Sequence, residues 1–200
     1  MQNRVPLMLV SEDMLIDTVD AQDVPSGVIR RSEALPAHAN FRVVHVFLFN
    51  RRNDLLIQQL SPSRGRHPGQ WGSSVAGYLF AGESYAEAAQ RRVFQELGVR
   101  QVDLHDYGKT AMNDEGCKKF ISLFVATCEG PFEFDREHIA QLEFLPVDAI
   151  KSLGERGERI LTPTFVHLLQ FYRMWVSGGY RRDSTTLKCV KRQPSGAVLT

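Results

Sequence analysis

The stretch Gly77-Tyr-Leu-Phe-Ala-Gly-Glu-Ser-Tyr-Ala-Glu-Ala-Ala-Gln-Arg-Arg-Val-Phe-Gln-Glu-Leu-Gly-Val99 predicts a loop, a helix and a second loop. Ser84 is a favourable N-cap residue, and Glu87, three residues later, completes a capping box. Gly98 is placed to end the helix in the left-handed conformation. Apolar residues recur every four positions and form one core-facing stripe of Tyr85, Ala89, Val93 and Leu97. We therefore predict a helix over 84–97 with Val93 and Leu97 buried.

The loop before this helix contains Gly77 and Gly82, which permit positive φ angles and a tight turn. The opposite face of the helix carries Arg92, Gln95 and Glu96. Their i, i+3, i+4 spacing places the three side chains on one side. The formal charge of this face is zero, because Arg92 contributes +1, Gln95 nothing and Glu96 −1.

This spacing resembles the Nudix box, in which glycine is followed by five residues, Glu, seven residues and then Arg-Glu-apolar-x-Glu-Glu-x-Gly-apolar. The matching positions are Gly77, Glu83, Arg91, Val93, Glu96, Gly98 and Val99. Arg92 and Gln95 stand where the pattern has glutamates, so the box is degenerate. The resemblance implies an α/β fold, a Nudix-type α/β/α sandwich with a mixed sheet, over roughly residues 14–176.

Length and composition are consistent with one globular domain of a soluble protein. The 200 residues can bury a sizeable core. The balance of 24 basic and 23 acidic residues argues against a general nucleic-acid or membrane-surface binder. Three cysteines without zinc-site spacing are typical of reduced thiols, and we expect a cytoplasmic protein with no signal peptide or membrane span. We expect a leader over 1–13, the Nudix domain over 14–176 and a flexible polar tail over 177–200.

The remaining chain alternates strand and loop patterns. Strands are predicted over 14–19, 28–30, 42–49, 55–60, 71–76, 102–112, 119–128 and 141–145. We expect two hairpins, one pairing 42–49 with 55–60 and one pairing 102–112 with 119–128. Residues 31–40 are predicted to be a polar connection and 61–70 a loop. A helical turn is expected over 146–153 and a helix over 164–176, opened by Pro163.

Several segments look like the isopentenyl-diphosphate isomerase branch of this family, namely 45–50, 68–77, 82–84, 91–92 and 96–99. An arginine at position 92 is normal in that branch. The isomerase reaction needs an acid and a base on opposite faces of the substrate. The resemblance places Ala76 at the catalytic cysteine, Tyr78 and Phe41 at two histidines, and Cys117 and Lys119 near the paired glutamates. Isomerisation is therefore kept only as the weakest alternative.

The residues that contact the diphosphate in the isomerases have counterparts in this sequence. The resemblance implies that Glu96 is catalytic and holds Mg²⁺, with Glu83 assisting as a second catalytic and metal-binding carboxylate. It also implies that Arg64 and Arg92 contact the diphosphate, and Arg66 lies in the same basic loop. Magnesium often takes one or two protein carboxylates together with phosphate oxygens. Guanidinium groups neutralise the remaining phosphate charge through forked hydrogen bonds.

Each of these residues also has an ordinary structural interpretation. Arg92 and Glu96 are an i, i+4 pair that would form a surface salt bridge worth only about 0.3–0.5 kcal/mol. Glu83 would favour the positive end of the helix, and the loop arginines would simply be solvated. Arg91 is expected to brace the loop–helix–loop. Glu87 is more consistent with a capping residue than a base, and His45 with a core histidine than a ligand.

Two functions of different classes follow. The first is a magnesium-dependent hydrolase of a nucleoside diphosphate or another organic diphosphate, in which a metal-oriented water attacks phosphorus. The second is a domain that binds such a small-molecule diphosphate without turning it over. No general base is identified, and Glu115 is a weak candidate. The oligomeric state is left open, with a homodimer as one option.

Overall fold

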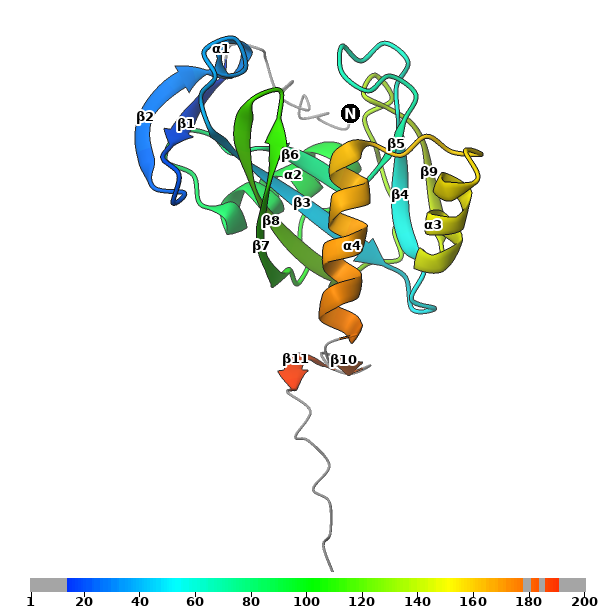
Figure 1. The fold of residues 1–200 in the computed structure, drawn as a ribbon. Coiled ribbons are helices and arrows are strands. Elements are labelled where there is room, and N and C mark those ends of the chain that lie inside the picture. The colour runs from blue at the N-terminus through cyan, green and yellow to red at the C-terminus, as the bar shows by residue number, and fades with distance from the viewer. Residues whose placement is uncertain (1–13, 178–180, 184–185, 191–200) are drawn as a thin grey trace, which may run out of the picture.

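The computed structural model describes residues 14–177, 181–183 and 186–190. The predicted leader and most of the predicted tail lie outside these residues, so the domain boundaries stay predictions. Within the tail, β10 (Arg181–Asp183) and β11 (Thr186–Val190) pair antiparallel. The sequence predicted no regular structure there, and these two short strands differ from that prediction (Figure 1).

A nine-stranded sheet forms the middle of the domain. Its strands are β1 (Leu15–Val19), β2 (Pro25–Arg30), β3 (Phe41–Phe49), β4 (Leu55–Leu60), β5 (Trp71–Gly72), β6 (Val75–Tyr78), β7 (His105–Asp114), β8 (Cys117–Thr127) and β9 (Ile139–Leu145). Central β3 runs parallel to β8 and antiparallel to β6. The other pairs are antiparallel, so the sheet is mixed, as predicted.

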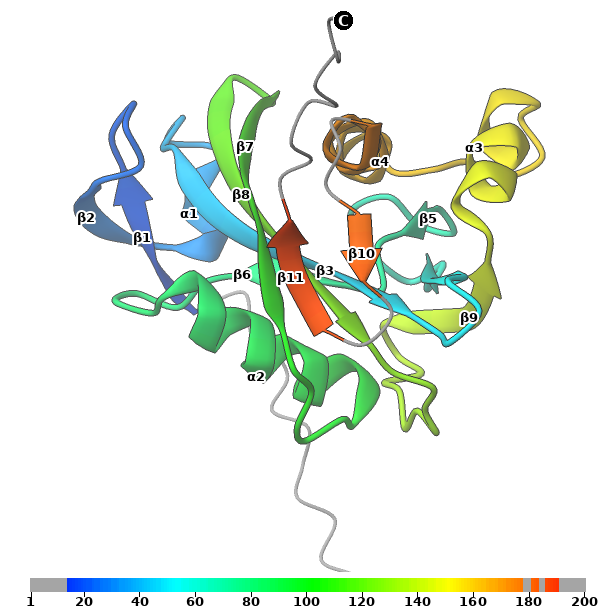
Figure 2. The ribbon, with the colours of Figure 1, turned by 90° about the horizontal axis from the view of Figure 1, so that it is seen from below.

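Helices cover both faces of this sheet. They are α1 (Arg31–Ala34), α2 (Tyr85–Leu97), α3 (Val147–Glu155) and α4 (Pro163–Ser177). Figure 2 shows α2 and α4 on opposite sides of β3 and β8. Side chains alternate along β3, so Val44 and Val46 pack on the α2 side while Phe47 packs against Phe165 of α4. The predicted α/β/α sandwich is confirmed.

The box helix forms where its local signals place it. The Ser84 side chain accepts a hydrogen bond from the backbone of Glu87, and the Glu87 side chain accepts one from the backbone of Ser84. Gly98 ends the helix with a φ of 71°. Val93 and Leu97 are fully buried. Burying each such side chain contributes about 1.5–3 kcal/mol. None of the helices in the described part of the chain is long and apolar enough to cross a bilayer.

The predicted hairpin of β3 and β4 is wrong over most of its length. The two strands meet only at Phe49 and Leu55. β8 pairs along one edge of β3 from Phe41 to Phe49, and β6 occupies the other edge at Val43–Val46. A strand has only two edges, so β4 turns away and pairs with β5 and β9 instead.

The predicted strand 71–76 is broken at Ser73 and Ser74. The hydroxyl of Ser73 bonds the ring of His45 at 2.9 Å, and Ser74 donates to the carbonyl of Leu56 at 2.6 Å. These bonds replace ladder bonds and let β5 pair with β4 while β6 pairs with β3. A further difference is α1, which lies within the predicted polar connection 31–40.

The predicted second hairpin is confirmed as β7 and β8. Asp114 pairs with Cys117, leaving Glu115 and Gly116 as a two-residue turn. Their φ values of 53° and 87° are both positive, as a type I′ turn requires. This turn brings Asp114 and Glu115 to the edge of the site described next.

Candidate functional site

Arg92 lies directly against the backbone of β6. An ideal Cβ built on Gly77 would be 2.2 Å from the Arg92 Nε, so only glycine leaves room for this side chain. Arg92 Nη2 donates to the Ala76 carbonyl at 2.9 Å and also to the Glu96 carboxylate. Gly82 has the expected positive φ of 76°. Gly77 instead lies within β6, where the absence of a side chain lets Arg92 approach the strand closely.

Glu96 is buried, and its carboxylate is bonded to residues of two elements. One carboxylate oxygen accepts from Arg92 of the same helix, and the other accepts from Gln58 Nε2 of β4 at 3.1 Å. Arg92 and Glu96 are both at most 9% exposed. The sequence raised the alternative of a surface salt bridge, but this pair is buried. Beside it, the Gln58 Oε1 is buried and has no hydrogen-bond partner among the described residues.

Glu83 and Arg91 brace the loop that enters the helix. Arg91 donates to the two carboxylate oxygens of Glu83 at 2.6 and 2.7 Å and to the Tyr78 carbonyl at 3.0 Å. Glu83 also accepts from the Phe80 backbone at 2.8 Å. The guanidinium of Arg91 lies 3.8 Å above the Phe80 ring. The expected bracing role of Arg91 is confirmed, and both oxygens of Glu83 are engaged in it.

Two further arginines, Arg31 and Arg64, form no salt bridge with a carboxylate in the described chain. No hydrogen bond or ion pair involves the half-buried guanidinium of Arg64 within the described residues. Burial has the largest effect and lowers the pKa of Arg64. The charges of Glu96 and Asp135 oppose this shift, whereas those of Arg92 and Arg31 add to it. The guanidinium of Arg31 lies 5.3 Å over the ring of Tyr78, and its Nε is buried without a partner in the described chain.

Sequence reasoning missed Arg31 as a site residue. It follows β2 in the short helix α1 and reaches Tyr78 across the sheet. The only signal in the sequence was the pair Arg30-Arg31 at the end of a predicted strand. That signal does not say which of the two side chains points toward the box.

Arg66 belongs to a separate, compensated group. It donates to Asp114 at 2.8 Å and to Glu115 at 2.9 Å, and Asp114 also accepts from Lys119 at 2.8 Å. Burial lowers the pKa of Arg66, but the bonds and charge of Asp114 outweigh it and raise that pKa overall. The weak base candidate, Glu115, is therefore in an exposed turn and paired with an arginine.

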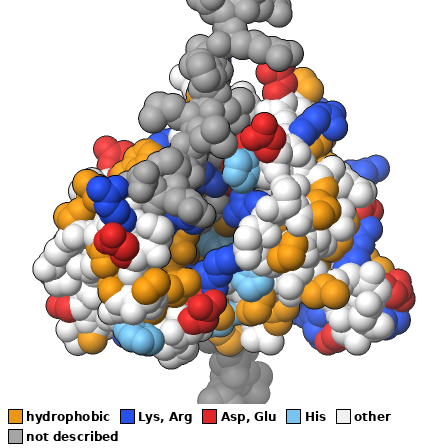
Figure 3. All heavy atoms as spheres, turned by 90° about the horizontal axis from the view of Figure 1, so that it is seen from above, with side chains coloured by type: hydrophobic (Ala, Val, Ile, Leu, Met, Phe, Trp, Pro, Cys, Tyr) orange, Lys and Arg blue, Asp and Glu red, His pale blue; other side chains and the backbone are white. Residues whose placement is uncertain are grey.

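The two groups differ in net charge. Arg66 and Lys119 against Asp114 and Glu115 sum to zero. The other group is called here the cationic cluster, and its formal charge is +1, from three positive and two negative side chains, which are Arg31, Arg64, Arg92, Glu96 and Asp135. Figure 3 shows Lys and Arg side chains gathered around a hollow in the middle of this face.

The box carboxylates form an incomplete site for a metal ion. No group of three or more His, Cys, Asp or Glu side chains in the described chain is arranged to hold a metal. Glu83 is fully engaged with Arg91 and Phe80, and its metal-binding role stays a prediction. Both oxygens of Glu96 are engaged too, by Arg92 and Gln58, so Mg²⁺ would have to replace one of these bonds. A single protein carboxylate is compatible with this ion, which usually keeps water and phosphate ligands, and the metal-binding role of Glu96 also stays a prediction.

Two other residues have the structural roles weighed from the sequence. His45 is buried, and burial lowers its pKa to about 3, with a smaller effect from the charge of Lys119. Its Nδ1 lies 2.9 Å from the Ser73 hydroxyl. Glu87 is the capping residue of α2. No residue is assigned as general base.

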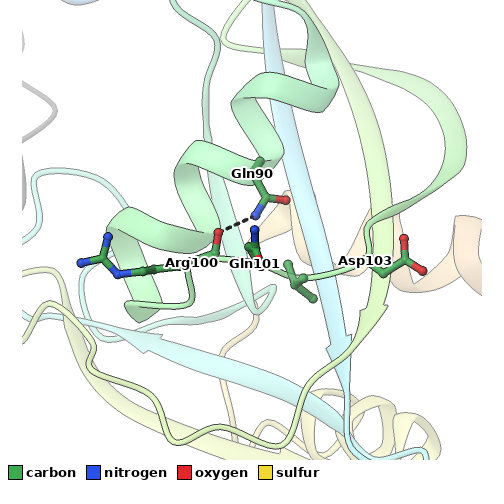
Figure 4. A pocket seen from close by; sticks show the side chains of 5 residues that line it. Gln90, Arg100, Gln101 and Asp103 are labelled. Atoms are coloured by element: carbon green, nitrogen blue, oxygen red, sulfur yellow. Dashed lines mark hydrogen bonds between the residues drawn. The ribbon is translucent and has the colours of Figure 1, made fainter.

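A second hollow of about 570 Å³ lies at the C-terminal end of α2 and in the chain that follows. Gln90 Nε2 donates to the Arg100 carbonyl at 3.1 Å across it. Figure 4 shows the side chains of Arg100 and Asp103 pointing away from each other. Its lining contains none of the predicted site residues, and its charged groups do not converge on a common point.

The NUDIX domain family matches residues 39–172. The chain belongs to the Nudix family. An uncharacterised Nudix hydrolase of Pseudomonas aeruginosa is 31% identical over 68% of this chain and 80% of its own length. An isopentenyl-diphosphate Δ-isomerase of Streptomyces coelicolor is 31% identical over 78% of this chain and 79% of its own. The Streptomyces relative supports the isomerase-like branch predicted from the sequence, and the Pseudomonas relative supports the wider family.

Solved structures share the fold. A Deinococcus radiodurans protein superposes with a TM-score of 0.70 at 24% identity, covering 78% of this chain and 98% of that one. The NUDIX domain of Shewanella oneidensis NrtR, solved with ADP ribose, gives a TM-score of 0.55 at 15% identity over 74% and 99%. At these identities the comparison concerns the fold.

Proposed function

We propose that this Nudix protein hydrolyses a phosphoanhydride bond of a small organic diphosphate, such as a nucleoside diphosphate. One observation carries the proposal, namely the excess positive charge of the cationic cluster. Buried charge without a partner is strongly destabilising, so proteins retain it mainly where a ligand completes it. Arg31 and Arg64 are half-buried and form no salt bridge with a carboxylate in the described chain, and they lie beside the box pair Arg92–Glu96. A diphosphate supplies the missing negative charge.

The residues of the cationic cluster would have different roles in binding and hydrolysis. The forked donors of Arg31, Arg64 and Arg92 would bind and orient phosphate oxygens and stabilise the charge that develops on them. Glu96 would hold Mg²⁺, which when bound supplies charge neutralisation and orientation of the attacking water. Glu83 would contribute by holding the loop through Arg91. Arg66, already paired with Asp114, would contact the ligand from the rim and add little net charge.

Binding without turnover is the second candidate, and the box itself favours it. Only Glu96 remains of the helix carboxylates, and it is already paired with Arg92. The Shewanella structure described above shows a NUDIX domain with ADP ribose bound, which supports a diphosphate ligand for either candidate. Isomerisation remains the weakest alternative, because Ala76 and Lys119 offer neither the cysteine nor the glutamate of that reaction.

A phosphate-release screen of organic diphosphates with Mg²⁺ tests the proposal, combined with calorimetry of the same compounds. Turnover that is lost in Glu96→Gln supports hydrolysis. Binding that weakens roughly a hundredfold in Arg64→Gln, without turnover by the parent, supports the binding domain. Absence of both binding and turnover across the panel overturns both candidates.

A further inference from the structure

Lys119 is a buried ammonium group whose hydrogen bonds are incomplete. Its side chain is 9% exposed. The Nζ atom donates to Asp114 at 2.8 Å and to the Thr164 hydroxyl of α4 at 2.8 Å. An ammonium group has three donors, and the third has no partner within the described residues. Burial lowers the pKa of Lys119, although the hydrogen bond and charge of Asp114 oppose this effect.

Lys119 lies outside the cationic cluster and is linked to it through a row of aromatic side chains. In the sheet, Lys119 of β8 pairs with Phe41 of β3. The Phe41 ring lies 5.2 Å from that of Tyr78, and Tyr78 carries the guanidinium of Arg31 on its face. A ligand held at the cluster by its phosphates would extend past Tyr78 toward Lys119.

The cationic cluster and the surroundings of Lys119 differ in net charge. The cationic cluster is positive, whereas the group formed by Arg66, Lys119 and their two acidic partners is neutral. The neutral end therefore offers no net attraction for a second phosphate. It offers a free hydrogen-bond donor on Lys119, which matches a hydroxyl or carbonyl oxygen.

We propose that Lys119 is the specificity-determining residue that selects an oxygen-bearing organic group, such as a sugar or nucleoside, over a hydrocarbon chain on the diphosphate. This inference rests on the proposed binding of diphosphates at the cationic cluster. A hydrocarbon chain packed over Lys119 would remove the third donor from water without giving it an acceptor. Sites with buried polar groups discriminate strongly against analogues that leave those groups unpaired.

Calorimetry with three probes tests this inference on the full chain. The probes are inorganic diphosphate, ADP-ribose and dimethylallyl diphosphate. We expect the parent protein to bind ADP-ribose at least tenfold more tightly than dimethylallyl diphosphate, about 1.4 kcal/mol. Lys119→Met should reduce this ratio to about unity or invert it. Its affinity for inorganic diphosphate should fall less than its affinity for ADP-ribose, because Asp114 remains paired with Arg66 and only one positive charge is lost.

Lys118→Met is the matched control, since the adjacent lysine is exposed and donates to the Ala21 carbonyl instead. It should keep the parent's ratio. If inorganic diphosphate binds but Lys119→Met keeps the parent's ratio of affinities for ADP-ribose and dimethylallyl diphosphate, the proposed role of Lys119 is overturned and the proposed function is not. Failure of inorganic diphosphate to bind the parent overturns the proposed function and with it this inference. Lys119→Gln, which retains a donor, should keep a preference for ADP-ribose and thereby separates hydrogen bonding from packing.

Discussion

At the scale of single residues, the site depends on how closely Arg92 approaches the strand beneath it. The contact with Gly77 explains why the box opens with a glycine that is not in a turn. The same contact holds Arg92 between the Ala76 carbonyl and Glu96. A side chain at position 77 would therefore disturb both the ion pair and the cationic cluster.

We expect Gly77→Ala to destabilise the protein by about 1–3 kcal/mol, the usual cost of overpacking a closely packed site. The new Cβ would be 2.2 Å from Arg92 Nε and would displace that side chain. Urea unfolding measures the loss. Gly65→Ala is the control, because nothing lies within 4 Å of its Cβ position. Equal stability of the two variants would contradict the close-approach role of Gly77.

Arg64→Gln should separate stability from ligand binding. Removing a half-buried cation without a partner in the described chain should leave the free energy of unfolding unchanged or higher. The affinity for a non-hydrolysable diphosphate should fall roughly a hundredfold. Arg52→Gln, at an exposed turn and 81% exposed, serves as the control and should change neither quantity. Parallel melting and calorimetry make the comparison, and unaltered affinity in Arg64→Gln would exclude Arg64 from the site.

Gln95→Glu addresses the missing box carboxylate. Gln95 Oε1 accepts from Arg91 at 2.9 Å and from Arg92 at 3.4 Å. A glutamate there would attract Arg92 away from Glu96 and free one carboxylate for Mg²⁺. We expect the magnesium requirement for activity or diphosphate binding to move to lower concentration. If the magnesium concentration required is the same in Gln95→Glu and in the parent, the result would count against a magnesium site on this face.

The sequence predicted the identity of these residues better than their partners. Arg91, Arg92 and Glu96 share a helix, so their spacing alone places them together. The partners that decide whether a charge is free lie on β4, β6 and the β7–β8 turn. Arg66 therefore appeared equivalent to Arg64 in the sequence. In the described chain, however, Asp114 forms a salt bridge with Arg66 and not with Arg64. Arg31 lies in no motif and depends on the packing of α1.

At the scale of secondary-structure elements, predictions succeeded where the determinants were local. α2 has its cap, apolar stripe and terminating glycine within one short segment, and all three agree. The partner of β4 was predicted wrongly, because strand pairing depends on which edges of β3 distant segments occupy. The break between β5 and β6 likewise depends on His45 and Leu56, which lie on other strands.

The bond between His45 and the β5–β6 break should make stability depend on pH. Burial keeps the pKa of His45 near 3 in the folded protein, against 6.5 when exposed. Between these values the unfolded chain binds more protons, so acidification favours unfolding. The loss should approach about 1.4 kcal/mol per pH unit below 6.5 and should be absent at higher pH.

His45→Gln removes this titration while keeping a polar group near Ser73. Urea unfolding of both proteins at pH 7.5 and 4.5 measures the effect. The difference in unfolding free energy between the two pH values should be smaller in the variant. The same pH dependence in both proteins would show that His45 is not kept neutral by burial.

At the scale of the whole molecule, two cores on opposite faces of the sheet hold the layers together. The larger aromatic core lies under α4, where Phe165 packs against Phe47 with ring centroids 5.8 Å apart. Thr164, the neighbour of Phe165, also bonds Lys119. Docking of α4 therefore contributes both to the core and to the neutral end of the site.

Phe165→Ala should cost about 3–5 kcal/mol, because Phe165 is fully buried and the cavity would only partly collapse. Val166→Ala is the control on the same helix, since Val166 is 39% exposed. Thermal and urea unfolding should rank the two variants in that order. Similar small losses would mean that α4 contributes little to the stability of the sandwich.

The parallel pairing of β3 with β8 affects how the chain folds during synthesis. β3 ends at Phe49 and its partner begins only at Cys117, so the central ladder must wait for a long intervening segment. Loop closure of this length precedes the favourable contacts and slows folding. A nascent chain that has already formed the box helix still exposes an unpaired edge of β3 rich in valine and phenylalanine. Until the ribosome has released β8, that edge is open to pairing with a strand of another chain.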